Sequence, residues 1–159
     1  KKDKRNLYLA MEGLILPDSE AAKSLSPNDL QRYQAAYKEK KQKLTNPNYF
    51  VSPTRLSIRN LPLTVTDKEL KDICAKAAQQ SVVEESDSKT GKKKGKVPTV
   101  KIVQAKIVRD KERKDADGHF RSKGFGFVEF QNHIHALAAL RTVNNNPTLF
   151  GKARRPMVE

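Results

Sequence analysis

The chain has 159 residues, a formal net charge of +14 and a pI near 9.9. This length allows one domain with an extension, or at most two very small domains. It has no apolar run of about 18 residues and no signal-peptide pattern, so we expect a soluble intracellular protein with no membrane partner. Its positive charge favours a polyanionic partner.

Residues 1–53 are predicted to form an N-terminal extension with one main helix at about 27–44. Ser26 is the expected N-cap, Pro27 occupies the first helical position, and Asn46-Pro47 ends the helix. Its apolar residues recur at helical spacing: Leu30, Tyr33, Tyr37 and Leu44. Three placements of this apolar face stay open: against the following domain, against an external partner, or loosely attached.

A second unit is predicted over residues 54–159, and its first strand contains Leu56-Ser57-Ile58-Arg59-Asn60-Leu61. Because side chains alternate along a strand, Ser57 and Arg59 share its exposed face. Thr66-Asp67-Lys68-Glu69 is a capping box, which predicts a helix to about Gln79. Cys74, the single cysteine, lies on the inward stripe of this helix and cannot form an internal disulfide, as is typical of a reducing compartment.

A basic insertion is predicted at residues 84–98, where lysines crowd around two glycines. Such a segment cannot form a core. Two interpretations stay open: a solvated loop, or a basic finger that RNA orders through phosphate contacts. The lysines chosen for those contacts are Lys92, Lys93 and Lys94.

Residues 123–130 read Lys-Gly-Phe-Gly-Phe-Val-Glu-Phe. They follow a second strand through Ile107-Val108-Arg109 and a predicted polar loop over 110–122 that contains Arg121. Strand alternation places Lys123, Phe125, Phe127 and Glu129 on one face. Two rings beside a lysine and a glutamate are unusual on a solvated surface and well suited to stacking bases beside a phosphate.

Asn132 is the expected N-cap of a last helix, which Asn144-Asn145-Asn146-Pro147 ends. A final strand begins near Pro156, and we expect it to be truncated at Glu159, with the chain a fragment of something longer. The resulting order is β-α-β-β-α-β. This predicts an α+β fold of the ferredoxin-like, split βαβ type with an N-terminal helical extension.

The octapeptide fits every position of the RNP1 signature of the RNA recognition motif, and residues 56–61 resemble its partner signature, RNP2. The second unit therefore resembles an RNA recognition motif (RRM). More narrowly, the chain resembles one motif of the nucleolar protein four family, whose animal counterpart is RNA-binding motif protein twenty-eight. That likeness rests on the helix at 26–44, the stop at 44–47, residues 57–62 and the connection at 144–151.

The resemblance implies a non-catalytic module that binds single-stranded or looped precursor ribosomal RNA during large ribosomal subunit assembly. It also implies a location in the nucleus and nucleolus, with other assembly factors or ribosomal proteins as partners. Phe127 is expected to stack a base, Phe125 to pack against sugars or a neighbouring base, and Lys123 to pair with a phosphate. The expected RNA-binding residues are Lys123, Phe125, Phe127, Arg59, Ser57, Lys92, Lys93, Lys94 and Arg121.

Ser57 departs from the family pattern, which usually has an aromatic ring at that position. Since base stacking on a ring is worth about 1–3 kcal/mol, its absence predicts weaker or less selective binding. Tyr49 and Phe50 either pack against the domain or stack a base in place of that ring. A rival hypothesis makes the motif chiefly a protein-interaction module within a ribonucleoprotein assembly, with Phe125 and Phe127 as interface anchors.

Motifs for catalysis are missing from this sequence. No nucleophile-base spacing, paired carboxylates or nucleotide-binding loop stands out, and nothing around the three histidines suggests a metal site. We therefore expect no enzymatic activity, no cofactor, no metal and no small-molecule substrate.

Overall fold

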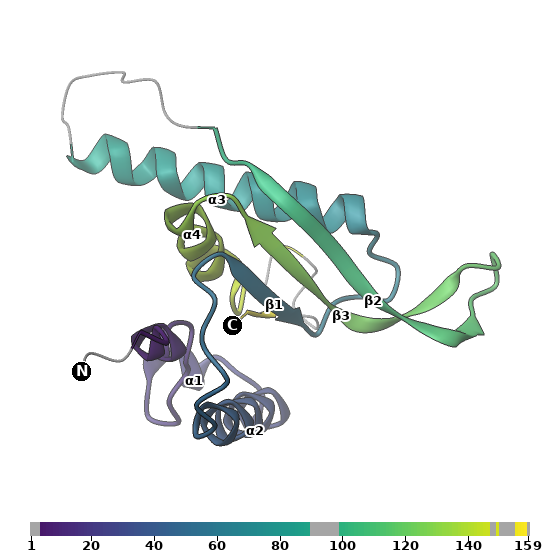
Figure 1. Cartoon of the computed structure of the whole chain (residues 1–159), viewed down its shortest axis with the longest axis horizontal. Helices are drawn as coiled ribbons and strands as arrows, with labels where there is room; N and C mark the ends of the chain where they lie inside the picture. Colours follow the sequence, from purple (N-terminus) through teal and green to yellow (C-terminus); the bar gives the residue numbers. More distant parts are fainter. Residues whose placement is uncertain (1–3, 90–98, 147–148, 150–154, 159) are drawn as a thin grey trace. The chain divides into compact units, whose positions relative to one another are not determined.

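The computed structural model describes residues 4–89, 99–146, 149 and 155–158, with the backbone alone over 85–89. Its contacts divide the chain into two units, Lys1–Pro53 and Thr54–Glu159. Figure 1 labels the main helices and strands of the two units.

The first unit is helical. Its elements are a 3-10 helix η1 (Leu7–Met11), a short helix α1 (Glu20–Lys23) and the long helix α2 (Pro27–Leu44). The Ser26 hydroxyl accepts a hydrogen bond from the Asp29 N–H at 3.2 Å, and Pro27 lies in the first turn. The N-terminus predicted for this helix is confirmed.

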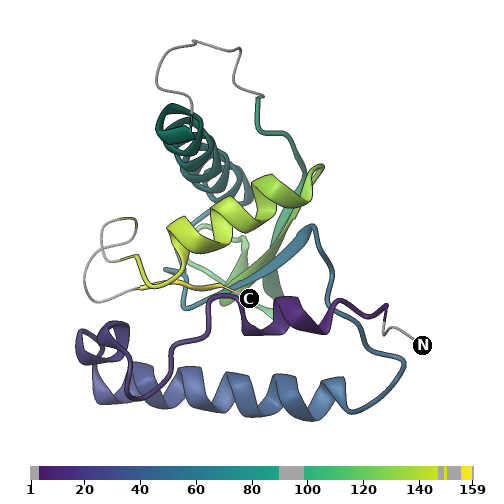
Figure 2. The same ribbon diagram turned by 90° about the vertical axis from the view of Figure 1, so that its left-hand side faces the viewer.

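The apolar face of α2 packs within the first unit. The buried residues of this unit are Ala10, Ile15, Ala22, Tyr33 and Ala36. η1 lies alongside α2 (Figure 2), where the Lys40 ammonium donates to the Ala10 carbonyl at 3.3 Å and the Arg5 guanidinium donates to the Leu44 carbonyl at 3.1 Å. The preceding chain segment therefore covers this face, an arrangement that none of the three predicted placements included.

The second unit contains a four-stranded sheet with two helices on one face. Its elements in chain order are β1 (Arg55–Arg59), α3 (Asp67–Lys89), β2 (Ile102–Lys114), β3 (Phe120–Phe130), α4 (His133–Val143) and β4 (Met157–Val158). The strand order is β2-β3-β1-β4, and all three neighbouring pairs are antiparallel. The predicted α+β fold is confirmed.

The core of this unit lies between the helices and the sheet. The sheet contributes alternate strand residues such as Ile58, Val128 and Phe130, and α3 and α4 contribute apolar stripes that include Leu70 and Leu140. Each such large side chain stabilises the fold by about 1.5–3 kcal/mol through burial. Cys74 is fully buried, and burial raises the pKa of its thiol to about 12.

Side-chain caps begin both helices where the sequence predicts. The Thr66 N–H donates to Glu69 Oε2 at 3.0 Å, and the Glu69 N–H donates to Thr66 Oγ1 at 3.2 Å, which is the reciprocal pattern of a capping box. Asn132 Oδ1 accepts from the Ile134 N–H at 3.0 Å. Both predicted helix starts are confirmed.

Two predicted boundaries are wrong. Helix α3 continues to Lys89 instead of ending near Gln79, so residues 84–89 of the expected insertion are helical. The expected loop at 110–122 is mostly strand, because β2 continues to Lys114 and β3 starts at Phe120. The two strands form a hairpin that extends past the helices in Figure 1.

Candidate nucleic-acid interface

The sheet face opposite the helices carries an exposed ring at its centre. Phe127 of β3 is 43% exposed. Across the strands, its register partners are Ser57 on β1 and Lys106 on β2. An aromatic ring is thus flanked by a small polar side chain on one side and by a cation on the other, which leaves room for a flat planar ligand over Phe127.

Phe125 supports Phe127 from the same strand. Their ring centroids are 6.4 Å apart, and the ring planes meet at 87°. In this edge-to-face arrangement, a base that stacks flat on one ring meets the other ring edge-on. The pair therefore offers one stacking platform and one lateral apolar wall.

Two glycines shape the strand that carries these rings. Gly124 has φ +80°, and a Cβ there would lie 3.4 Å from the Leu61 carbonyl oxygen. A Cβ on Gly126 would lie 2.7 Å from the Lys106 carbonyl oxygen, closer than real Cβ contacts. The first glycine allows a left-handed backbone, and the second allows β3 to approach β2 closely beside Phe127.

The acidic residues near the rings already form ion pairs or hydrogen bonds with other groups of the protein. The Arg55 guanidinium lies 3.4 Å from the Glu129 carboxylate. A hydrogen bond from the Glu112 N–H at 3.0 Å holds the pKa of Asp110 below its usual range, and the charges of Lys123 and Arg113 lower it further. Asp110 is therefore ionised at neutral pH and partly compensates the charge of Lys123.

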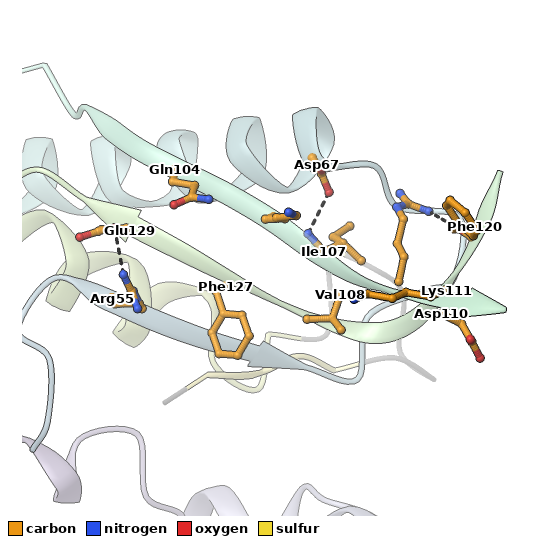
Figure 3. A pocket seen from close by; sticks show the side chains of 12 residues that line it. Arg55, Asp67, Gln104, Ile107, Val108, Asp110, Lys111, Phe120, Phe127 and Glu129 are labelled. Carbon is orange, nitrogen blue, oxygen red and sulfur yellow. Dashed lines mark hydrogen bonds and ion pairs between the residues drawn. The ribbon is translucent and has the colours of Figure 1, made fainter. Parts of the chain in front are cut away.

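A groove of about 560 Å³ runs along the β2 side of this surface (Figure 3). Phe127, Val108 and Phe120 supply apolar surface, and Lys106, Arg109 and Lys111 supply cations. At its wall, Asp67 Oδ1 accepts a hydrogen bond from the Ile107 N–H at 2.8 Å, which ties the start of α3 to the edge strand. The groove thus joins aromatic stacking surface to four cations and three carboxylates, a small excess of positive charge.

Comparisons with known proteins agree with this geometry. A family model described as the RNA recognition motif matches residues 100–153. RNA-binding protein 28 of Homo sapiens is 41% identical over 155 residues, which is 98% of this chain. The chain therefore contains an RNA recognition motif. It spans 18% of the length of RNA-binding protein 28.

Solved structures of RNA-binding proteins are also similar. The crystal structure of RNA-binding protein PG1 is 20% identical and covers 67% of this chain and 90% of its own, with a TM-score of 0.44. The solution structure of the penultimate RNA recognition motif of hypothetical RNA-binding protein RBM19 is 23% identical and covers 67% and 80%, with a TM-score of 0.43.

The RRM brings some of the predicted site residues together and separates others. Ser57, Phe125 and Phe127 lie on adjacent strands of one sheet face. Arg59 lies on the opposite flank from the groove, at the register position that pairs with Met157 of β4. Lys123 and Arg121 are exposed on the hairpin half of β3. The remaining three, Lys92, Lys93 and Lys94, lie outside the described residues.

The prediction missed the β2 residues that line the groove of the RRM: Gln104, Lys106, Val108 and Arg109. Ile107 is buried, so alternation alone would have placed its neighbours Lys106 and Val108 on the opposite face. Whether they line the same groove as Phe127 depends on the register between β2 and β3, for which the sequence carried no signal.

The described residues show no metal centre and no membrane span. No group of three or more His, Cys, Asp or Glu side chains in these parts of the chain could hold a metal ion. Among the same residues, no helix combines the length and the apolar character that crossing a bilayer requires.

Proposed function

We propose that the open sheet face of the RRM binds single-stranded or looped RNA without catalysis. The observation that carries this proposal is the exposed Phe127 ring between Ser57 and Lys106. Base stacking on an aromatic platform combined with cation contacts to phosphate is how sheets of this kind hold single strands.

In this proposal the aromatic residues stack bases and the cationic residues contact phosphates. Phe127 stacks one base, and the edge-on Phe125 packs against the sugar or the neighbouring base. Lys106 and Lys123 contact phosphates, and Arg59 adds a contact on the β4 side. Ser57 supplies no ring, so this face holds fewer stacked bases than a motif with all three platforms and binds RNA less selectively.

In the cell, we propose that the RNA is precursor ribosomal RNA and that the protein assists large ribosomal subunit assembly in the nucleolus, inside the nucleus. The likeness to human RNA-binding protein 28 and the resemblance to the nucleolar protein four family support this proposal. Ribosomal proteins and other assembly factors are the protein partners we propose. Mapping crosslinked RNA positions for the full-length protein tests this assignment, and crosslinks confined to transcripts other than ribosomal precursors would refute it.

The sheet proposal is tested by titrating fluorescein-labelled single-stranded RNA with the chain and with Phe127→Ala. Removal of the stacking platform is expected to weaken binding by about 1–3 kcal/mol. Ile134→Ala is the matched control, because Ile134 is an exposed apolar residue on α4, which belongs to the layer on the other face of the sheet. It should bind RNA like the unchanged chain.

Two outcomes would count against the sheet as the RNA surface. In the first, Phe127→Ala binds RNA like the unchanged chain while a triple change of Lys92, Lys93 and Lys94 abolishes binding. In the second, Phe127→Ala leaves RNA affinity intact but removes a protein partner. This result would favour the alternative in which the motif is a protein-interaction module.

A further inference from the structure

The two ends of α2 differ in charge. The helix has 18 residues and spans about 27 Å at the usual rise. Asp29 lies in its first turn, and the acidic residues Asp18 and Glu20 precede it. Its last two turns carry four lysines, and their one acid, Glu39, is paired with Lys43 at 2.7 Å. Positive charge therefore gathers at the C-terminal end of this helix.

The start of the chain adds further cations at the same end. The Arg5 guanidinium donates to the carbonyls of Leu44 and Asn46, at 3.1 and 3.4 Å. The Val51 N–H donates to the Arg5 carbonyl at 2.9 Å, and the Asn6 amide donates to the Val51 carbonyl at 3.4 Å. These bonds hold the segment beginning at Lys4 beside the segment that leaves α2.

Three aromatic rings are exposed on these paired segments. Tyr8, in η1, is 72% exposed, while Tyr49 and Phe50, just after α2, are 50% and 66% exposed. The helix dipole accounts for cations in the last turn of α2, since they are favoured near its negative end. The helix dipole does not explain why three large aromatic rings are exposed to solvent on the segments at the same end.

We propose that this basic end of the first unit, formed by Lys4, Arg5, Tyr8, Lys41, Tyr49 and Phe50, is a second binding site for single-stranded RNA. The rings stack bases, and the cations contact the intervening phosphates. A protein partner fits this surface less well, because the cores of protein interfaces are depleted in lysine. The site lies wholly within residues 4–53 and does not depend on the sheet proposal.

The test uses the full 159-residue chain and a fluorescein-labelled single-stranded RNA of mixed sequence. The double variant Tyr49→Ala/Phe50→Ala is expected to bind at least about thirtyfold more weakly, because two exposed platforms are lost. Leu16→Ala is the matched control, since Leu16 is an exposed apolar residue of the same unit outside the basic end, and it should leave affinity unchanged. Ultraviolet crosslinking should place RNA on Tyr49 or Phe50. Circular dichroism checks that each variant is folded.

Combining variants separates this site from the sheet. A Phe125→Ala/Phe127→Ala chain should keep measurable RNA binding that disappears when Tyr49→Ala/Phe50→Ala is added. If the sheet binds no RNA, the sheet variant alone has no effect while the Tyr49/Phe50 variant still weakens binding, and the second site stands. If the Tyr49/Phe50 variant binds RNA like the unchanged chain and no crosslink reaches these rings, the second site is refuted. That same result is expected if the rings anchor a protein.

Discussion

Gly126 precedes Phe127 on β3, at a position where an added side chain would meet the backbone of β2. A Cβ at this position would lie 2.7 Å from the Lys106 carbonyl oxygen and 3.0 Å from Ile107 Cα, both of which belong to the backbone. Backbone atoms in a paired strand cannot move aside as a flexible side chain can. The glycine therefore maintains the geometry that places Lys106 next to Phe127.

Gly126→Ala is expected to lower the free energy of unfolding by about 1–3 kcal/mol, through overpacking against β2. Gly118→Ala is the comparison. Gly118 has φ +82°, but a methyl group added there would meet nothing within 4 Å, so its cost is limited to backbone strain of about 1 kcal/mol. Urea unfolding measures both changes. If Gly118→Ala lowers the free energy of unfolding as much as Gly126→Ala or more, overpacking at Gly126 is not the cause of its destabilisation.

The rings were predictable as individual residues, and so was the missing platform at Ser57. Strand alternation depends only on neighbours in the sequence, so Phe125 and Phe127 were correctly assigned to one face. The position of Lys106 was not predictable in this way. It lies beside Phe127 because of the register between two strands, which the local pattern of residues does not specify.

Asp67 connects two elements, the start of α3 and the edge strand β2. Its carboxylate accepts the Ile107 N–H at 2.8 Å, at a position where the edge strand has no neighbouring strand to bind this donor. Edge strands present such donors to solvent or to other chains unless they are covered. The contact fixes part of the groove wall described above.

Asp67→Ala is expected to destabilise the fold by about 1–3 kcal/mol, because a partly buried N–H loses its acceptor. Amide hydrogen exchange at Ile107 should become faster. Asp67→Asn keeps an acceptor oxygen and should retain most of the protection, while Asp72→Ala, on an exposed position of the same helix, controls for loss of charge. Unchanged exchange at Ile107 in Asp67→Ala would contradict the role assigned to this bond.

The hairpin of β2 and β3 shows why strand boundaries were harder to predict than the starts of capped helices. Residues 110–114 carry a charge at every position, so they lack the apolar and polar alternation that marks a strand. Pairing with β3 makes them a strand nonetheless, and Asp115 closes the turn by accepting the N–H groups of Asp117 and His119 at 3.0 Å each. The starts of α2, α3 and α4 depend on caps, which are local, and these three starts were predicted correctly.

The whole chain, with its net charge of +14, should bind RNA in a strongly salt-dependent manner. Each phosphate contact on a single strand steepens the log-log dependence of affinity on salt by about 0.7. Lys106→Ala is expected to reduce this slope by about that amount, because it removes one such contact. Phe127→Ala should weaken binding at every salt concentration with the slope unchanged, because stacking releases no counterions.

Titrations at several salt concentrations measure both effects. A slope that falls in Phe127→Ala, or that stays constant in Lys106→Ala, would show that the assignment of stacking and charge to these two residues is wrong. Ile134→Ala again serves as the control, since its exposed side chain is uncharged and lies on α4.

Local sequence alone determined the order of the strands and helices in the second unit, the capped starts of α2, α3 and α4, the exposed rings and the excess of positive charge. Each of these depends on residues within a few positions of one another, so pattern and composition are sufficient to identify them. Folding in three dimensions determined which surfaces those residues form. The partner of the α2 apolar face, the contact of Asp67 with Ile107 and the row from Ser57 through Phe127 to Lys106 all join residues far apart in the chain. Such contacts depend on register and packing, which no short stretch of sequence specifies.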